Sequence, residues 1–255
     1  MSGPSRTSGP STRSPTGGPA RERPGQRTAR PIPEPTALAL AVSIGLAVAV
    51  GAILFGAAGR WDVPRFWAYL AVLLALNVAG VGVTSPELTR ERLHPGPGER
   101  DRLSRLLIVP VLGAHWLLAG LDACPGPAAS SDHLHRLLQA VGLVAFAGGM
   151  VVALWAVRSN PFFSSAVRIQ SERGQRVIDD GPYRFVRHPG YSGALVAGLG
   201  SALALGSAQS LVPIVIGDAV LVWRTALEDR MLRAELPSYA DYAARVRHRL
   251  VPGLW

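Results

Sequence analysis

Long uncharged apolar runs alternate with short polar segments along most of the chain. The runs are Ala37–Gly59, Phe66–Val83, Leu106–Leu121, Leu137–Val157 and Pro189–Trp223, the last interrupted only by Asp218. Runs of this kind predict membrane-spanning helices. A straight helix over the last run would be roughly 50 Å long, against a hydrocarbon core of about 30 Å, so we expect a hairpin that turns near Gly206–Ser210. The pattern predicts an all-α integral membrane protein with about six membrane segments, the last two forming a helical hairpin.

The distribution of charge supports this architecture and predicts its orientation. All 26 basic residues are arginine, against 17 acids, and the net charge is +9. With the N-terminal segment inside, the inner segments hold 23 arginines, and the outer loops hold only Arg60, Arg65 and Arg136. The inner segments are then 1–36, 84–105, 158–188 and 224–255. Basic residues favour the cytoplasmic face, so we expect both termini and any cofactor pocket there.

The composition further narrows the class of protein and its expected partners. The arginines lie between apolar runs rather than along one face of a polar domain, which favours membrane lipids and excludes nucleic acid as the expected partner. Arginine as the sole basic residue, in an alanine-rich chain, is typical of a GC-rich bacterial genome and predicts a multi-pass protein of the bacterial plasma membrane. Cys124 is the single cysteine, so we expect neither an intramolecular disulfide nor a cysteine-rich zinc site.

The N-terminal segment differs from the rest of the chain. Residues 1–35 contain eight prolines, five glycines and six arginines but almost no aliphatic side chain, which predicts a disordered cytoplasmic tail. The apolar stretch that follows is too long for the h-region of a signal peptide, so we expect it to remain as a membrane helix. The predicted organisation is thus a tail, 1–35, and a membrane domain, 36–255.

A different pattern follows the last apolar run. Leu227, Met231 and Leu232 recur at helical spacing, and Pro237 then interrupts. Beyond it, one side of the pattern carries Tyr239, Tyr242 and Val246 and the other carries the arginines at 245, 247 and 249. This amphipathic pattern predicts an interfacial helix on the inner leaflet.

Candidate chemistry gathers between Arg158 and Tyr191. Pro189 suits the first turn of a helix, which places Arg187 and His188 at its beginning. Free N–H groups and the positive end of the helix dipole favour an anionic group such as a carboxylate or phosphate. The alternative is that Arg187 reaches lipid headgroups and His188 caps the helix. The residues alone leave both interpretations open.

Three sequence elements between residues 181 and 253 resemble one family. Arg-His-Pro-x-Tyr-x-Gly at 187–193 follows Gly-Pro-Tyr-Arg, Arg224 precedes Glu228 and Asp229 by one helical turn, and Tyr239 and Tyr242 precede a terminal Pro segment. Together, in this order, they resemble the isoprenylcysteine carboxyl methyltransferase and phospholipid methyltransferase superfamily over roughly residues 140–255. The resemblance implies a membrane methyltransferase that uses S-adenosylmethionine, with its catalytic part at about 158–255.

The resemblance also implies a set of site residues. The expected cofactor-binding residues are Gln170, Val177, Ile178, Tyr183, His188, Pro189, Gly190, Tyr191 and Glu228. Arg224 and Glu228 are the expected catalytic residues, with Arg224 near the substrate carboxylate. Relatives often have a histidine where this chain has Gln175, so no cofactor contact is assigned there. Asp229 replaces a glutamate, which keeps the charge and shortens the reach.

The methyl acceptor remains open at this stage. A carboxylate nucleophile needs no base, and no dedicated base stands out, which favours a lipophilic carboxylate as the acceptor. A phospholipid or other small-lipid amine is the alternative. Membrane sterol reductases, which bind NADPH, share a similar C-terminal pattern but normally have a longer transmembrane array. A transporter or scaffold is disfavoured because the polar residues gather at one end.

Other polar and small residues in the apolar runs have simpler interpretations. Asp218 is either functional or paired within the bundle, whereas Asn77 and His115 are expected to bond between helices. His133 and His135, with Asp132, are not expected to bind a metal. The glycines expected to allow close helix packing are those at 51, 56, 59, 142, 148, 149, 198 and 200.

Overall fold

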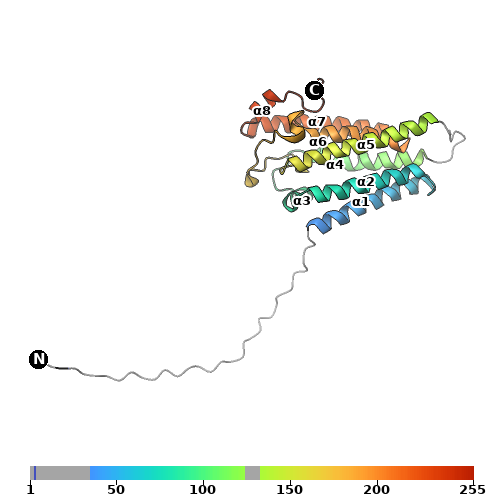
Figure 1. Ribbon diagram of the computed structural model, residues 1–255, viewed down its shortest axis with the longest axis horizontal. Coiled ribbons are helices and arrows are strands. Elements are labelled where there is room, and N and C mark those ends of the chain that lie inside the picture. The colour runs from blue at the N-terminus through green and yellow to red at the C-terminus, as the bar shows by residue number, and fades with distance from the viewer. Residues whose placement is uncertain (1–2, 4–34, 124–132) are drawn as a thin grey trace. The chain divides into compact units, whose positions relative to one another are not determined.

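A computed structural model describes residues 3, 35–123 and 133–255 (Figure 1). The predicted disordered tail lies outside the described residues except for residue 3 and Pro35, which is the first residue of α1, and Cys124 and Asp132 also lie outside them. Within the described part of the chain, all regular structure is helical, as expected. The α-helices are α1 (Pro35–Ala58), α2 (Pro64–Val83), α3 (Pro86–Leu93), α4 (Arg102–Leu121), α5 (His133–Ser159), α6 (Pro189–Leu205), α7 (Leu211–Glu235) and α8 (Tyr239–Arg245).

The predicted membrane segments all form helices, and the protein is an integral membrane protein. Among the described residues, α1, α2, α4 and α5 are long and apolar enough to cross a membrane, and α6 is a shorter apolar helix of 17 residues. The hairpin prediction is confirmed, because α6 ends at Leu205 and α7 begins at Leu211. Gly206 closes α6 with a φ of 66°, a left-handed conformation that glycine adopts without strain.

Glycines bring α5 and α6 into backbone contact. A Cβ added at Gly142, Gly149 or Gly200 would lie 2.3 to 2.5 Å from backbone atoms of the partner helix, so only glycine permits this approach. The prediction of close packing is therefore confirmed at these positions. It is wrong at Gly56, Gly59 and Gly148, where an added Cβ would meet nothing within 4 Å. These two helices run side by side and position the pocket described below.

The polar residues within the spans differ in their hydrogen-bond partners. His115 bonds between helices as predicted, with Nε2 2.7 Å from Ser201 Oγ and Nδ1 3.1 Å from the Ser210 carbonyl oxygen. Asn77 instead donates to the carbonyl oxygen of Leu73 in its own helix, so the interhelical prediction is wrong there. Asp218 makes no hydrogen bond or ion pair to any residue that the structure describes.

The region expected to form one interfacial helix has two parts. Helix α7 continues without a break to Glu235, so Leu227, Met231 and Leu232 belong to it. The short helix α8 follows, and its Tyr239 and Tyr242 are 4% and 2% exposed within a core of the protein. The tyrosine face therefore packs against the protein rather than against the leaflet.

Candidate functional site

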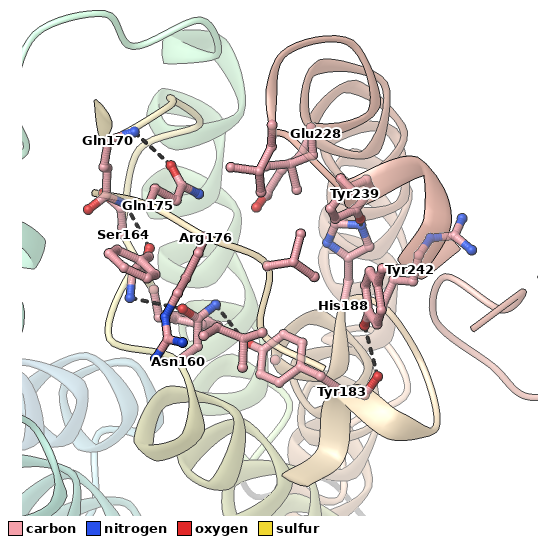
Figure 2. A pocket seen from close by; sticks show the side chains of 18 of the residues that line it. Asn160, Ser164, Gln170, Gln175, Arg176, Tyr183, His188, Glu228, Tyr239 and Tyr242 are labelled. Carbon is pink, nitrogen blue, oxygen red and sulfur yellow. Dashed lines mark hydrogen bonds between the residues drawn. The ribbon is translucent and has the colours of Figure 1, made fainter. Parts of the chain in front are cut away.

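A pocket of about 720 Å³, open to solvent at its mouth, lies at one end of the helical bundle (Figure 2). Its walls come from the connector between α5 and α6, the first turn of α6, the polar end of α7, and α8. Residues distant in the sequence, such as Asn160 and Tyr242, meet here because α5 ends where α6 begins and α7 returns to the same end.

Most of the residues predicted from the motifs line this pocket. Those that do are Gln170, Val177, Ile178, Tyr183, His188, Gly190, Tyr191 and Glu228. Pro189 does not: it is buried as the first residue of α6, where it fixes the direction of the helix. Arg224 also lies outside the lining, one side chain behind Tyr191. Gln175, to which no contact was assigned, does line the pocket.

A chain of hydrogen bonds connects Glu228 to the interior. The Tyr191 hydroxyl donates to Glu228 Oε2 at 2.6 Å and accepts from Arg224 Nε at 3.0 Å. Arg224 then donates to Asp101 Oδ2 at 3.2 Å and to the carbonyl oxygen of Ser165 at 2.8 Å. Sequence reasoning missed Asp101, which precedes α4, because no local motif marks its distance from Arg224. The arrangement fixes the Glu228 carboxylate, half-buried, at the pocket wall.

Asp229, next to Glu228, faces away from the pocket into a cluster of arginines. Its carboxylate accepts from Arg187 at 2.7 and 3.2 Å, from Arg233 at 3.1 Å and from Arg249 at 3.0 Å. The Tyr239 hydroxyl adds a bond of 3.0 Å. Burial alone would raise the pKa of the Asp229 carboxyl, but hydrogen bonds from neighbouring basic groups outweigh it and hold the pKa well below its ordinary value.

Arg187 therefore follows neither of the two interpretations left open by the sequence. Its side chain is 2% exposed, and besides Asp229 it donates to the carbonyl oxygens of Val246 and Arg247. It is occupied in holding the C-terminal segment rather than lipid headgroups or an external anion. His188 also makes no side-chain cap at the start of α6. Its ring stacks on Tyr191 at 5.9 Å between centroids.

The C-terminal segment completes this wall through its backbone. The amide nitrogens of Arg187 and His188 donate to the carbonyl oxygens of His248 and Arg249 at 3.0 and 2.9 Å. Ser192, in the first turn of α6, donates its hydroxyl to the carbonyl oxygen of Leu250 at 2.6 Å. These bonds hold the His188 turn in place from behind the pocket.

On the opposite wall, the connector is shaped by amides. The Gln170 side chain, 1% exposed, donates to the carbonyl oxygen of Phe162 at 2.7 Å, and the Gln170 backbone N–H donates to Gln175 Oε1 at 2.6 Å. Nearby, Asn160 Nδ2 donates to the Tyr183 hydroxyl at 3.2 Å, and the Tyr242 hydroxyl donates to the Tyr183 carbonyl oxygen at 2.8 Å. Figure 2 shows Tyr183 and Tyr242 joined in this way. Burial raises the pKa of Tyr183, so its ring stays neutral at physiological pH.

The lining matches the chemistry of an amino-acid-containing nucleoside. The Glu228 carboxylate is an acceptor for an ammonium group, while Arg176 supplies donors for a carboxylate. His188 also lines the pocket, but its Nε2 lies 3.5 Å from Asp229 Oδ1 behind the wall. The connector contributes apolar side chains for a flat ring, among them Val177 and Ile178. Gly190 keeps the entrance of α6 close to the Phe163 ring, because an added Cβ would lie 2.5 Å from it.

Comparison with known proteins finds methyltransferases that are similar to part of this chain. Residues 137–236 match the family model described as phospholipid methyltransferase. A probable protein-S-isoprenylcysteine O-methyltransferase of Oryza sativa subsp. indica is 32% identical over 117 residues, covering 43% of this chain and 59% of that protein. Protein-S-isoprenylcysteine O-methyltransferase B of Arabidopsis thaliana is 31% identical over 90 residues, covering 33% of this chain and 44% of its own length.

The match is thus partial in length. It spans somewhat more than half of the rice protein, and the family model covers α5, the connector, α6 and α7. These are the elements that build the pocket and carry the motifs. Over residues 137–236, the chain resembles the isoprenylcysteine carboxyl methyltransferase and phospholipid methyltransferase superfamily, as the motifs predicted.

Proposed function

We propose that the pocket binds S-adenosylmethionine and that the protein transfers its methyl group to a lipophilic acceptor in the membrane. One observation carries the proposal: eight of the nine cofactor-binding residues implied by the motifs line a single pocket. They are spread from Gln170 to Glu228, across the connector and two helices. The methyltransferase relatives support the same class of reaction.

The cofactor supplies a methyl group activated on a positively charged sulfonium, and the protein supplies binding and orientation. Glu228, fixed by Tyr191, would accept hydrogen bonds from the ammonium group, and His188 would line the part of the pocket that takes the carboxylate. The neutral ring of Tyr183 offers an aromatic face to a cationic centre, worth about 0.5 to 2 kcal/mol. Alignment within a pocket that excludes water can supply roughly 7 to 11 kcal/mol of barrier reduction.

The proposed acceptor is a carboxylate on a lipophilic molecule. Arg224 uses three of its five N–H groups on Tyr191, Asp101 and Ser165. Because Arg224 is buried outside the pocket lining, it would act on the acceptor carboxylate through its positive charge from behind Tyr191 rather than by direct contact. A carboxylate needs no proton removed before it attacks, which agrees with a site where the carboxylates at Asp101, Glu228 and Asp229 are already engaged.

The alternative acceptor is a lipid amine, which the description of the matched family favours. An ammonium group must lose a proton before methylation, and Glu228 is the carboxylate on the pocket wall placed to accept one. The two acceptors make opposite demands on Arg224, since a cation at that position attracts a carboxylate and repels an ammonium.

An acceptor assay with the full chain in lipid nanodiscs distinguishes these reactions. The acceptors are N-acetyl-S-farnesylcysteine and phosphatidylethanolamine, each with radiolabelled S-adenosylmethionine. We expect base-labile methyl ester from the first, and at least about a tenfold loss of its kcat/KM in Arg224→Gln. Methylation of the amine alone would refute the carboxyl assignment and leave the cofactor assignment standing.

Cofactor binding is tested separately by calorimetry on the detergent-purified protein. S-adenosylhomocysteine should bind saturably with one site per chain, whereas NADPH should not. Binding of NADPH in place of S-adenosylhomocysteine would refute methyl transfer and favour the reductase alternative. We also propose that the pocket faces the cytoplasm, on the side that holds 23 of the 26 arginines; cysteine labelling at either end of the bundle in intact cells tests this orientation.

A further inference from the structure

A second cavity, of about 580 Å³, lies at the other end of the bundle. Its walls come from the first turns of α2 and α5 and the last residues of α6. Figure 1 shows α5 and α6 running side by side. Since α5 ends and α6 begins at the methyl-transfer pocket, the lining residues place the two cavities at opposite ends of these helices. This cavity takes no part in the function proposed above.

Two arginines from different helices line the cavity. They are Arg65 of α2 and Arg136 of α5. Gln139 also lines the cavity, and the lining holds no carboxylate. Among the residues that the structure describes, basic residues are scarce at this end, where they are Arg60, Arg65 and Arg136. Two of these three meet in one cavity, against the general preference for arginine on the cytoplasmic side.

The helix ends around the two arginines favour an anion in the cavity, in addition to the partners already present: Asp122 lies near enough to Arg65 to stabilise its charge, and Arg136 Nη2 lies 3.2 Å from His133 Nδ1. Both arginines lie in the N-terminal turns of their helices, where the helix dipole is positive, and neither first turn contains an acidic residue. The Arg65 Nε–H donates to the carbonyl oxygen of Leu205 at 2.9 Å, and the guanidinium group lies over the Phe66 ring, 5.1 Å from its centroid. The terminal nitrogens of Arg65 make no hydrogen bond to any residue that the structure describes. A phosphate between the two helix ends would meet both arginines and the helix dipoles.

The surroundings place the cavity at the level of lipid headgroups. Trp61 and Trp67 lie at the same end, 68% and 54% exposed, and the Trp67 indole donates to the Trp61 carbonyl oxygen at 3.0 Å. Exposed tryptophans of this kind mark the boundary between membrane and water. Below the cavity, α5 presents exposed apolar residues, Leu137, Val141 and Val144, along which acyl chains can lie.

We propose that this cavity binds the phosphate of an anionic phospholipid, in the leaflet opposite the one that faces the methyl-transfer pocket. Arg65 and Arg136 hold the phosphate, Gln139 contributes an amide, and the acyl chains follow the exposed face of α5. The lipid then bridges the beginnings of α2 and α5 and stabilises the end of the bundle that the cofactor does not reach.

Native mass spectrometry of the full chain tests this site with phosphatidylglycerol, phosphatidylcholine and diacylglycerol as probes. We expect phosphatidylglycerol to be retained in preference to the other two. The double variant Arg65→Gln, Arg136→Gln should weaken its binding at least about tenfold, because two charge-assisted hydrogen bonds are lost. Arg60→Gln is the matched control: it removes the same charge from the same end, but Arg60 is paired with Asp62 outside the cavity, so binding should stay within about twofold.

Three results would overturn the proposal. Equal loss in Arg60→Gln would show a general charge effect, and equal retention of diacylglycerol would show that the phosphate is not recognised. Displacement of phosphatidylglycerol by millimolar inorganic phosphate would assign the cavity to the free anion instead. Arg136 is exposed, so Arg136→Gln alone serves if the double variant melts at a lower temperature. S-adenosylhomocysteine binding should be unchanged in all of these variants.

Discussion

Glu228 and Asp229 are neighbours on one helix but belong to different environments. Glu228 faces the pocket, accepts one hydrogen bond from Tyr191 and is half-buried. Asp229 is fully buried and accepts from three arginines and a tyrosine. Because successive residues of an α-helix point about 100° apart, a motif with paired acids can serve two purposes. We infer that Glu228 serves ligand binding and Asp229 holds the pocket wall together.

The largest expected effect comes from breaking the Asp229 cluster. Asp229→Ala leaves Arg187, fully buried, without its carboxylate, and breaking a buried ion pair of this kind costs about 3 to 5 kcal/mol. We expect a large fall in the melting temperature in detergent, measured by differential scanning fluorimetry. A melting temperature equal to that of the parent protein would contradict the structural role. Asp229→Asn, which keeps the shape and part of the hydrogen bonding, should lose less.

Acid should remove the same contribution in the unaltered protein. The pKa of Asp229 is lowered in the folded state from an ordinary value of 3.8, so its contribution to stability is fully present above about pH 4 and declines as the pH falls further. Melting temperatures measured from pH 7 down to pH 3 should therefore fall for the parent protein. Asp229→Asn should lose less stability over the same interval, and parallel curves would argue against this assignment.

Substitution of Glu228 should weaken ligand binding and leave the melting temperature nearly unchanged. Glu228→Gln removes the charge that faces the ammonium group but leaves the shape, so we expect roughly ten- to a hundredfold weaker S-adenosylhomocysteine binding, measured by calorimetry. Its melting temperature without ligand should stay close to that of the parent. Arg230→Gln, at an exposed position two residues further along α7, controls for a change of charge near the pocket. Unchanged affinity in Glu228→Gln would remove Glu228 from the site.

The smallest effect is expected on the outer surface of α8. Arg245 pairs with Asp179 at 2.9 Å, but the two side chains are 62% and 56% exposed. Pairs of this kind contribute about 0 to 1 kcal/mol. Arg245→Ala should therefore change neither the melting temperature nor the S-adenosylhomocysteine affinity measurably. A large loss of either would mean that Arg245 contributes more to the pocket than its exposed pair suggests.

Local pattern was sufficient to predict the helices, and the family resemblance indicated eight of the residues that line the pocket. Apolar length located the six segments, the excess length of the last run required a turn near Gly206, and the motif around His188 marked the pocket. The pairs Arg224–Asp101 and Arg187–Asp229 could not be predicted, because each joins residues far apart in the chain. For the same reason Asn77 and Tyr239 were misplaced: polarity and period locate a residue on a helix, but not the partner that the helix packs against.

The backbone bonds from Arg187 and His188 to His248 and Arg249 have a consequence for biosynthesis. A ribosome makes the His188 turn about sixty residues before the stretch that braces it. The nascent chain can therefore insert its spans into the bilayer while the cofactor site is still incomplete, and binding competence arrives only after His248 and Arg249 have been made. Fusion partners placed after Arg249 will be tolerated only if they leave that bracing stretch free to dock.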